Sequence, residues 1–199
     1  AGILNLKGTQ YVDVIGLSLD DHAQCGRVGN SNGCSSNFPM DDYANNGILS
    51  NTSTANVTLT DVDVQGTANN GWVGPIGGNV TATRLYVGFN VGAGINLDDG
   101  SGTGSTGGLF SLISSTIEWN GCIQEYPKVD TVPALICFAQ GSSGYGDAIG
   151  TPTNDGASFL ISQSIIRYNT QDGVDLLHSF GGTILVTRSQ IYGNMGQSI

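Results

Sequence analysis

The stretch SFLISQSIIRYN, residues 158–169, decides the fold because its pattern recurs along the chain. Aligned without gaps, six such segments begin at residues 11, 56, 79, 109, 158 and 183: YVDVIGLSLDDH, NVTLTDVDVQGT, NVTATRLYVGFN, LFSLISSTIEWN, SFLISQSIIRYN and TILVTRSQIYGN. In each segment apolar and polar residues alternate, the alternation changes phase once, and it then resumes. Alternation with a period of two is typical of β-strands. Each segment therefore predicts two short strands with a bend between them.

Residues at equivalent positions of the six repeats form columns, and the twelfth column is rich in asparagine: Asn90, Asn120, Asn169 and Asn194. Stacked asparagines can pass side-chain hydrogen bonds from one repeat to the next. Shortly after this column a glycine precedes an apolar residue, which predicts a third strand: Gly47-Ile48, Gly71-Trp72, Gly94-Ile95 and Gly173-Val174. Three short strands per repeat, at a shortest spacing of 23 residues, predict an all-β parallel β-helix of about six coils. We expect residues 1–199 to form one such domain.

The columns and the asparagine ladder resemble those of the right-handed parallel β-helix repeat proteins, the superfamily that includes pectate lyases. The resemblance extends over nearly the whole chain and implies a right-handed solenoid. It also implies a polysaccharide-directed function, either as a polysaccharide lyase or as a glycoside hydrolase. The catalytic motifs of the individual enzymes are absent, and Tyr145-Gly146-Asp147 only partly matches the Tyr-Gly-x-Asp-Pro-His signature of the β-helical mannuronan epimerases. Whether the chain is an enzyme stays open, because a fold alone does not fix a function.

Composition limits the classes of partner. Sixteen acidic residues against six basic ones give a net charge of −10. This balance argues against nucleic acid, whose binding depends on lysine and arginine side chains that neutralise phosphates. No apolar run approaches the ~18 residues of a membrane-spanning helix.

The four cysteines predict a secreted protein. Cys25, Cys34, Cys122 and Cys137 lack the CxxC spacing of a zinc site, so two disulfides are expected, with buried free thiols as the alternative. The pairings 25–34 and 122–137 close the shortest loops. Disulfides imply an extracellular location.

Three insertions interrupt the repeats, at about 23–45, 98–108 and 121–146. The first and the third each contain two cysteines, so we expect two long disulfide-braced loops. The ends of the chain are predicted to be in phase, because Gly2-Ile3-Leu4 matches Gly47-Ile48-Leu49 and Ile199 follows Ile191 as Val174 follows Ile166. Such ends suit a fragment of a longer solenoid or copies that associate end to end.

An acidic face on the third strand is the candidate site. In Val174-Asp175-Leu176 the apolar neighbours face inward, so Asp175 is expected to face outward. The equivalent strand of an earlier repeat presents Asn96 and leads into Asp98 and Asp99. The repeat that lies between these two repeats has Asp147 at the start of its third strand. The predicted catalytic residues are Asp175, His178 and Asp147, which include two carboxylates suited to acid–base cleavage of a glycan. The predicted calcium ligands are Asp98, Asp99 and Asp175, because Ca²⁺ takes many oxygen ligands. The alternative is a solvated acidic surface.

Further side chains are candidates for substrate binding: Asn96, Trp119, Tyr126 and Lys128. The aromatic rings among them would stack on sugar rings. Trp72 falls in an inward-facing column and is expected in the core. The register also predicts two ion pairs between neighbouring repeats, Glu118 with Arg167 and Asp61 with Arg84. The competing function is structural: a non-catalytic fibre, stalk or filament segment.

Overall fold

The computed structural model of this chain describes residues 2–20, 46–67, 69–90, 92–97, 106–121, 146–150, 154–175, 179–180, 182–196 and 199. Every regular element in this part of the chain is a β-strand, and every strand pair is parallel. Within it, no helix is long and apolar enough to cross a membrane. The four cysteines lie outside the described residues, as does most of the three insertions.

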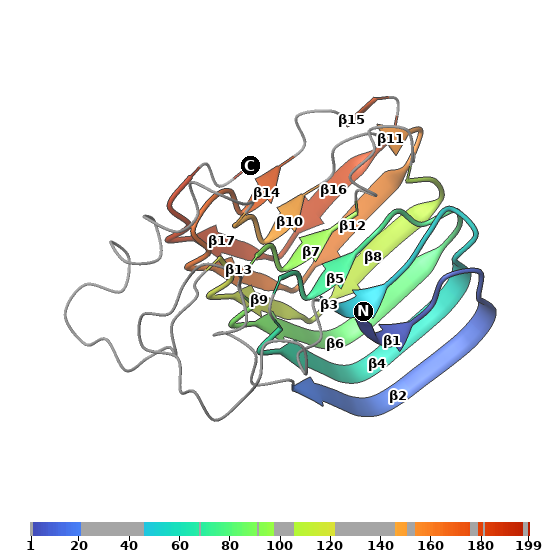
Figure 1. Cartoon of the computed structure of the whole chain (residues 1–199). Helices are drawn as coiled ribbons and strands as arrows, with labels where there is room; N and C mark the ends of the chain where they lie inside the picture. Colours follow the sequence, from blue (N-terminus) through green and yellow to red (C-terminus); the bar gives the residue numbers. More distant parts are fainter. Residues whose placement is uncertain are drawn as a thin grey trace, which may run out of the picture.

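Two larger sheets make up the body of the molecule (Figure 1). The six-stranded sheet contains, in spatial order, β1 (Gly2–Asn5), β3 (Asn46–Leu49), β5 (Trp72–Val73), β7 (Ile95–Asn96), β10 (Ile149–Gly150) and β14 (Val174–Asp175). The nine-stranded sheet begins with β2 (Gln10–Asp20), β4 (Ala55–Gln65) and β6 (Val80–Gly88). Beyond β6 it divides into the series β8 (Leu109–Ile113), β12 (Ser158–Ser162) and β16 (Ile184–Thr187), and the series β9 (Thr116–Glu118), β13 (Ile165–Arg167) and β17 (Gln190–Tyr192). A small third sheet pairs β11 (Asn154–Asp155) with β15 (Ser179–Phe180). Because each strand pairs with its equivalent in the next repeat, the arrangement is consistent with a β-solenoid.

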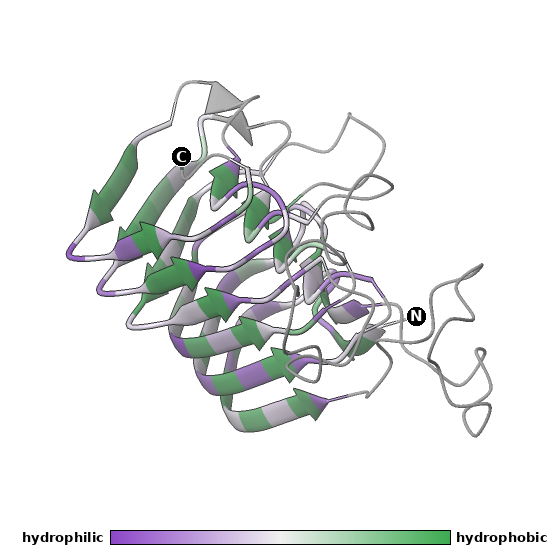
Figure 2. Cartoon of the chain, turned by 90° about the vertical axis from the view of Figure 1, so that its left-hand side faces the viewer, coloured by the Kyte–Doolittle hydropathy of each residue, from purple (hydrophilic) through white to green (hydrophobic). Residues whose placement is uncertain are grey.

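The strand register confirms the columns predicted from the repeat. The second column runs through the nine-stranded sheet as Val12, Val57, Val80, Phe110, Phe159 and Ile184. In the six-stranded sheet Ile48, Trp72, Ile95, Ile149 and Val174 are in register, which confirms the predicted third strand. These inward columns meet in one core, where the Trp72 ring lies 5.6 Å from that of Phe110. The green and purple bands of Figure 2 show the alternation along the strands.

The change of phase inside each repeat is a bend in left-handed backbone conformation. The sixth column has a positive φ in all six repeats: Gly16, Asp61, Arg84, Ser114, Gln163 and Arg188. The eleventh column repeats this feature at Gly66, Phe89, Trp119, Tyr168 and Gly193. A non-glycine residue in this conformation costs about 1–2 kcal/mol. Contacts between repeats act against this cost in part, as where Arg84 forms an ion pair with Asp61, with Nη2 2.8 Å from Oδ2. The second predicted pair is also present, with Arg167 Nε 2.6 Å from Glu118 Oε2.

The predicted asparagine ladder is present and buried. The amide groups of Asn90, Asn120 and Asn169 each donate from Nδ2 to Oδ1 of the next asparagine, over 2.9 Å in every case. Each Oδ1 also accepts a backbone N–H of the previous repeat, as Asn169 Oδ1 does from Asn120. A parallel serine ladder occupies the seventh column, where Ser115 and Ser164 hydroxyls accept backbone N–H groups of the preceding repeat.

The register of the first strand differs from the prediction by one residue. Gly2 pairs with Asn46 and Leu4 with Ile48, so Leu4 and not Ile3 occupies the inward column. Leu4 packs against the core, whereas Ile3 is exposed. The cause is a connection to the next strand that is one residue shorter than its counterpart: Leu4 and Gln10 are six residues apart, whereas their partners Ile48 and Ala55 are seven apart.

Asn120→Ala is expected to lower the free energy of unfolding by about 2–4 kcal/mol, because it removes the ladder acceptor of the buried Asn90 backbone N–H and side-chain amide and one of the two hydrogen bonds that Asn169 Oδ1 accepts. Urea unfolding followed by tryptophan fluorescence measures this change. Asn194→Ala is the matched control, since Asn194 is only half-buried at the end of the ladder and donates to no further asparagine among the described residues. Equal losses in the two variants would show that the ladder is not a source of stability.

Candidate functional site

An outward-facing column on the six-stranded sheet positions two of the predicted residues. Asn96 on β7, Gly150 on β10 and Asp175 on β14 are in register on three successive repeats. The middle position lacks a side chain, and a Cβ added to Gly150 would lie 3.5 Å from Asp147 Oδ2 and 3.8 Å from Asn96 Oδ1. Gly150 is buried, and a side chain added there would begin between these polar oxygens.

Asp147 lies two residues before β10, in the turn that leads into the strand and not on the outward face itself. Its side chain is 4 % exposed, and its Oδ1 accepts the backbone N–H of Asp172 at 3.0 Å. Earlier repeats have the same contact: Asn46 Oδ1 accepts from Asn70 N–H, and Asn70 Oδ1 accepts from Ala93 N–H. Asp147 thus belongs to a second polar ladder, which is interrupted at Ala93 and in which Asp147 replaces asparagine.

Sequence reasoning missed this second ladder. The signal that identifies it is an asparagine or aspartate immediately before the glycine that introduces the third strand, as in Asn46-Gly47, Asn70-Gly71 and Asp172-Gly173. Asp147 is harder to recognise, because Ala148 replaces the glycine in its repeat.

The environment of Asp147 raises the pKa of its carboxyl group. Burial raises the pKa of the Asp147 carboxyl from 3.8 to about 6. The hydrogen bond from the Asp172 backbone acts in the opposite direction, and the charges of Asp175 and Asp172 raise the pKa further. A carboxyl group with such a pKa is partly protonated near neutral pH and can donate a proton.

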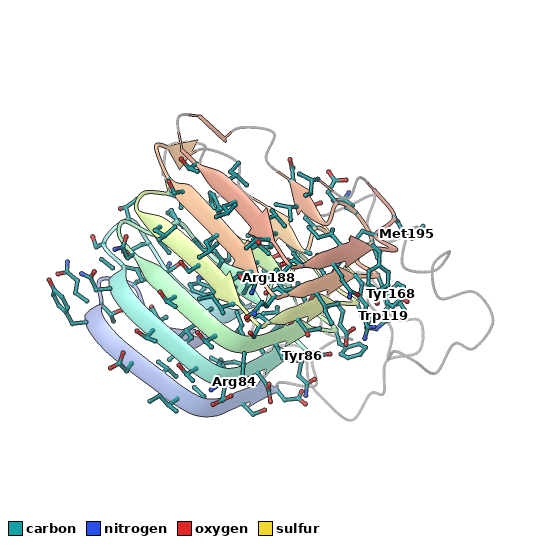
Figure 3. The ribbon with its side chains drawn as sticks, turned by 180° about the vertical axis from the view of Figure 1, so that it is seen from behind. Arg84, Tyr86, Trp119, Tyr168, Arg188 and Met195 are labelled. Atoms are coloured by element: carbon teal, nitrogen blue, oxygen red, sulfur yellow. The ribbon has the colours of Figure 1, made fainter. Side chains whose placement is uncertain are left out.

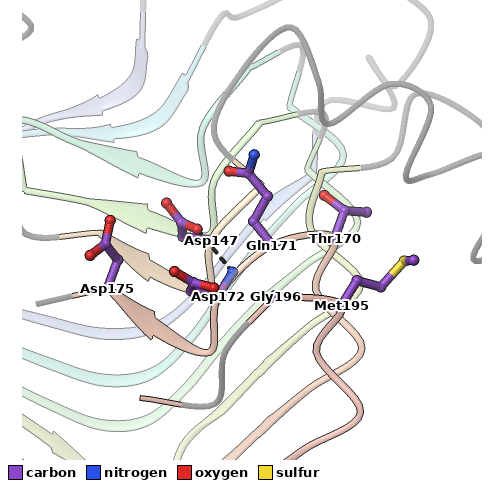
Figure 4. Close-up of a pocket in the computed structure, with 7 residues that line it drawn as sticks. All are labelled: Asp147, Thr170, Gln171, Asp172, Asp175, Met195 and Gly196. Atoms are coloured by element: carbon purple, nitrogen blue, oxygen red, sulfur yellow. Dashed lines mark hydrogen bonds between the residues drawn. The ribbon is translucent and has the colours of Figure 1, made fainter. Parts of the chain in front are cut away.

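Asp147 and Asp175 meet at a pocket of about 330 Å³ (Figure 4). The residues that line it come from the turns that lead into β10 and β14, from β14 itself and from the final repeat: Asp147, Thr170, Gln171, Asp172, Asp175, Met195 and Gly196. Gln171 is fixed in place by its Oε1, which accepts the Gly146 N–H at 2.9 Å. None of the seven residues carries a positive charge.

Thr170 shows why two glycines stand at the base of the third insertion. The side chain is buried, and its hydroxyl has no hydrogen-bond partner among the described residues. A Cβ on Gly121 or on Gly146 would clash with this hydroxyl oxygen. Gly121 also has a φ of +90°, which a glycine adopts without strain.

Trp119 does not line the pocket and has one face covered. It stacks on Tyr168 with ring centroids 4.4 Å apart (Figure 3). Tyr168 in turn meets the edge of Tyr192. Arg167 lies over the Tyr168 ring at 5.3 Å and donates to the Tyr192 hydroxyl. These contacts link the side chains of three successive repeats beside the left-handed backbone of Trp119 and Tyr168.

The remaining predicted site residues, His178, Tyr126, Lys128, Asp98 and Asp99, lie outside the described residues. Among the residues that are described, no three histidine, cysteine, aspartate or glutamate side chains are grouped so that they could hold a metal ion. Asp147, Asp172 and Asp175 are therefore not a metal site by themselves.

Comparisons of the chain with family models, with curated proteins and with solved structures found no match.

Asp147→Asn is expected to make the protein more stable at pH 7, by on the order of 2–3 kcal/mol. Asparagine keeps an acceptor for the Asp172 N–H and removes a buried charge. Because the pKa of Asp147 is raised in the folded chain, its favourable contribution is complete below about pH 4 and is lost as the pH rises through about 6. The two proteins should therefore be similar in stability at pH 4 and diverge by pH 7, as measured by urea midpoints at several pH values. A constant difference between them across this range would contradict the assignment.

Proposed function

We propose that this chain is an extracellular, polysaccharide-directed protein with a right-handed parallel β-helix of the pectate-lyase-like kind, and that its acidic pocket cleaves a glycan as a glycoside hydrolase does. The observation that carries the proposal is the buried Asp147 carboxyl, with its raised pKa, at the same pocket as Asp175. The repeat pattern and the parallel register support the architecture. Most glycosidases catalyse hydrolysis with a pair of carboxyl groups that lie in different environments.

In this reaction Asp147 acts as the general acid. Its proton passes to the glycosidic oxygen as the bond from that oxygen to the anomeric carbon breaks. The Asp175 carboxylate takes a proton from a water molecule, whose oxygen forms the new bond to the anomeric carbon. Transfer of that proton back to Asp147 through solvent completes the cycle.

The charges of the pocket favour a neutral or amino-sugar glycan over a polyuronate. Three carboxyl groups line the pocket, and no described cation lies there. The described arginines Arg84 and Arg167 are engaged in ion pairs on the other sheet. An anionic sugar would meet repulsion, whereas hydroxyl and ammonium groups would find acceptors. This specificity departs from that of pectate lyases, whose resemblance to this chain concerns the scaffold.

Calcium and disulfides belong to the same proposal. Asp175 together with Asp98 and Asp99 would supply hard oxygen ligands to Ca²⁺, although the described residues alone do not form such a site. The pairs Cys25–Cys34 and Cys122–Cys137 would brace the two long loops in an oxidising environment.

Asp175→Asn and Asp147→Asn are each expected to reduce glycan hydrolysis by at least about 100-fold, because each removes one member of the acid–base pair. Reducing-end release from neutral, amino-sugar and uronate polysaccharides measures the activity. Asp63→Asn, on the opposite sheet, is the charge-matched control. A wild-type chain without activity on any glycan, or an Asp175→Asn variant with full activity, would overturn the proposal.

Gly150 provides a steric test of the same site. Gly150→Gln should block substrate, since its side chain would project between Asn96 and Asp175. Gly150→Ala should retain binding, because its Cβ makes only ordinary contacts. Equal glycan affinity of the two variants, measured by calorimetry, would place the substrate elsewhere.

A further inference from the structure

Three asparagines stand in the Asn-x-Ser/Thr pattern that accepts an N-linked glycan: Asn51-Thr52-Ser53, Asn56-Val57-Thr58 and Asn79-Val80-Thr81. All three lie where the chain passes from the six-stranded sheet to the nine-stranded sheet. Asn51 is in the turn between β3 and β4, Asn56 is the second residue of β4, and Asn79 immediately precedes β6. The Val57 N–H donates to Asn79 O, so Asn56 and Asn79 belong to neighbouring strands at one corner of the molecule.

The surroundings of these side chains leave room for a sugar on the amide nitrogen. Asn56 and Asn79 are exposed, and Asn51 is half-buried. Asn51 Oδ1 accepts the backbone N–H of Gly8 at 2.9 Å, and Asn79 Oδ1 accepts that of Leu109 at 3.1 Å. No described residue accepts a hydrogen bond from the Nδ2 of any of the three asparagines. An N-linked sugar is bonded to Nδ2, so both hydrogen bonds to Oδ1 are kept when it is attached.

The asparagines of the buried ladder could not carry a sugar, and they lack the pattern. Asn90, Asn120 and Asn169 are buried, and each uses its Nδ2 to donate to the next asparagine. None of them is followed two positions later by serine or threonine. The pattern therefore occurs where the fold leaves the amide nitrogen unused and is absent from the ladder, where the fold depends on that nitrogen.

We propose that Asn51, Asn56 and Asn79 are attachment sites for N-linked glycans. The donor is a lipid-linked oligosaccharide diphosphate, and a separate transferase of the secretory route catalyses the step. Nδ2 forms a bond to the anomeric carbon of the first sugar and loses one proton to a base of the transferase. The bond from that carbon to the phosphate oxygen breaks, and the lipid diphosphate leaves with the electron pair. The inference rests on the extracellular location proposed above and not on the cleavage of a glycan.

Sugars at these sites leave the acidic pocket accessible. The strands of the six-stranded sheet are parallel, so they all begin at one side of the sheet and end at the other. The pocket is lined by the turns that lead into β10 and β14, whereas Asn51 and Asn79 follow the ends of β3 and β5. We therefore expect the same activity at the pocket with and without attached sugars.

Secretion of the full chain from cultured mammalian cells, with a secretion leader, tests the proposal. Partial digestion with a peptide-N-glycosidase should show the loss of three glycans as steps in gel mobility. Ser53→Ala, Thr58→Val and Thr81→Val should each remove one step, because each takes away the hydroxyl that the pattern requires. Valine has the shape of threonine and favours strands. Thr58→Ser is the matched control, since it changes the same residue, keeps the hydroxyl and should keep all three steps.

Stability provides a second readout. Digestion leaves aspartate at each site, whose oxygen can still accept the N–H groups of Gly8 and Leu109, so the urea midpoint should be the same before and after digestion. A wild-type chain without glycosidase-sensitive sugar, or sugar that persists in the Ser53→Ala/Thr58→Val/Thr81→Val variant, would overturn the proposal. Polysaccharide hydrolysis is measured separately on the same protein: its absence counts against the pocket, whereas absence of attached sugar counts against these sites.

Discussion

Asn90, Asn120 and Asn169 have fully buried side chains, and they can be buried only because each amide meets an equivalent amide in the next repeat. An amide removed from water without partners would cost several times what one hydrogen bond contributes. A slip of one residue between neighbouring strands would break these bonds and turn every inward side chain outward. The ladder therefore fixes the register of the nine-stranded sheet, and that register in turn decides which side chains meet on the outer face and at the pocket.

The fold was predictable because its signals are periodic and local. The alternation and its phase change recur in six repeats, and asparagine recurs in the twelfth column of four of them, so a single substitution does not hide these patterns. The register of the first strand could not be predicted, because the shorter connection before β2 leaves no trace in the apolar pattern: Ile3 and Leu4 are equally apolar, and only packing distinguishes them. The left-handed bends were not foreseen in detail, since Asp61, Arg84, Ser114 and Gln163 share no residue type.

The candidate site was predictable in part. Alternation along Val174-Asp175-Leu176 was sufficient to expect Asp175 on the outer face, and the structure places it there in register with Asn96. The role of Asp147 was not accessible in this way, because its burial and its contact with the Asp172 backbone arise from stacking of two turns that are 25 residues apart. A ladder position needs only an acceptor oxygen, which asparagine supplies without charge. The presence of aspartate at this buried position opposes stability, and such conflicts between local stability and residue choice are typical of functional sites.

The stacking of repeats also determines how the molecule would respond to force. Each repeat contacts only its neighbours, so tension applied to the two ends would detach the repeats one at a time from an edge. Successive ladder residues are separated by 23, 30, 49 and 25 residues. At ~3.4 Å per extended residue, each detachment would lengthen the chain by roughly 80 to 165 Å. The longest of these steps contains Cys122 and Cys137, so a disulfide between them would shorten that step and leave the others unchanged.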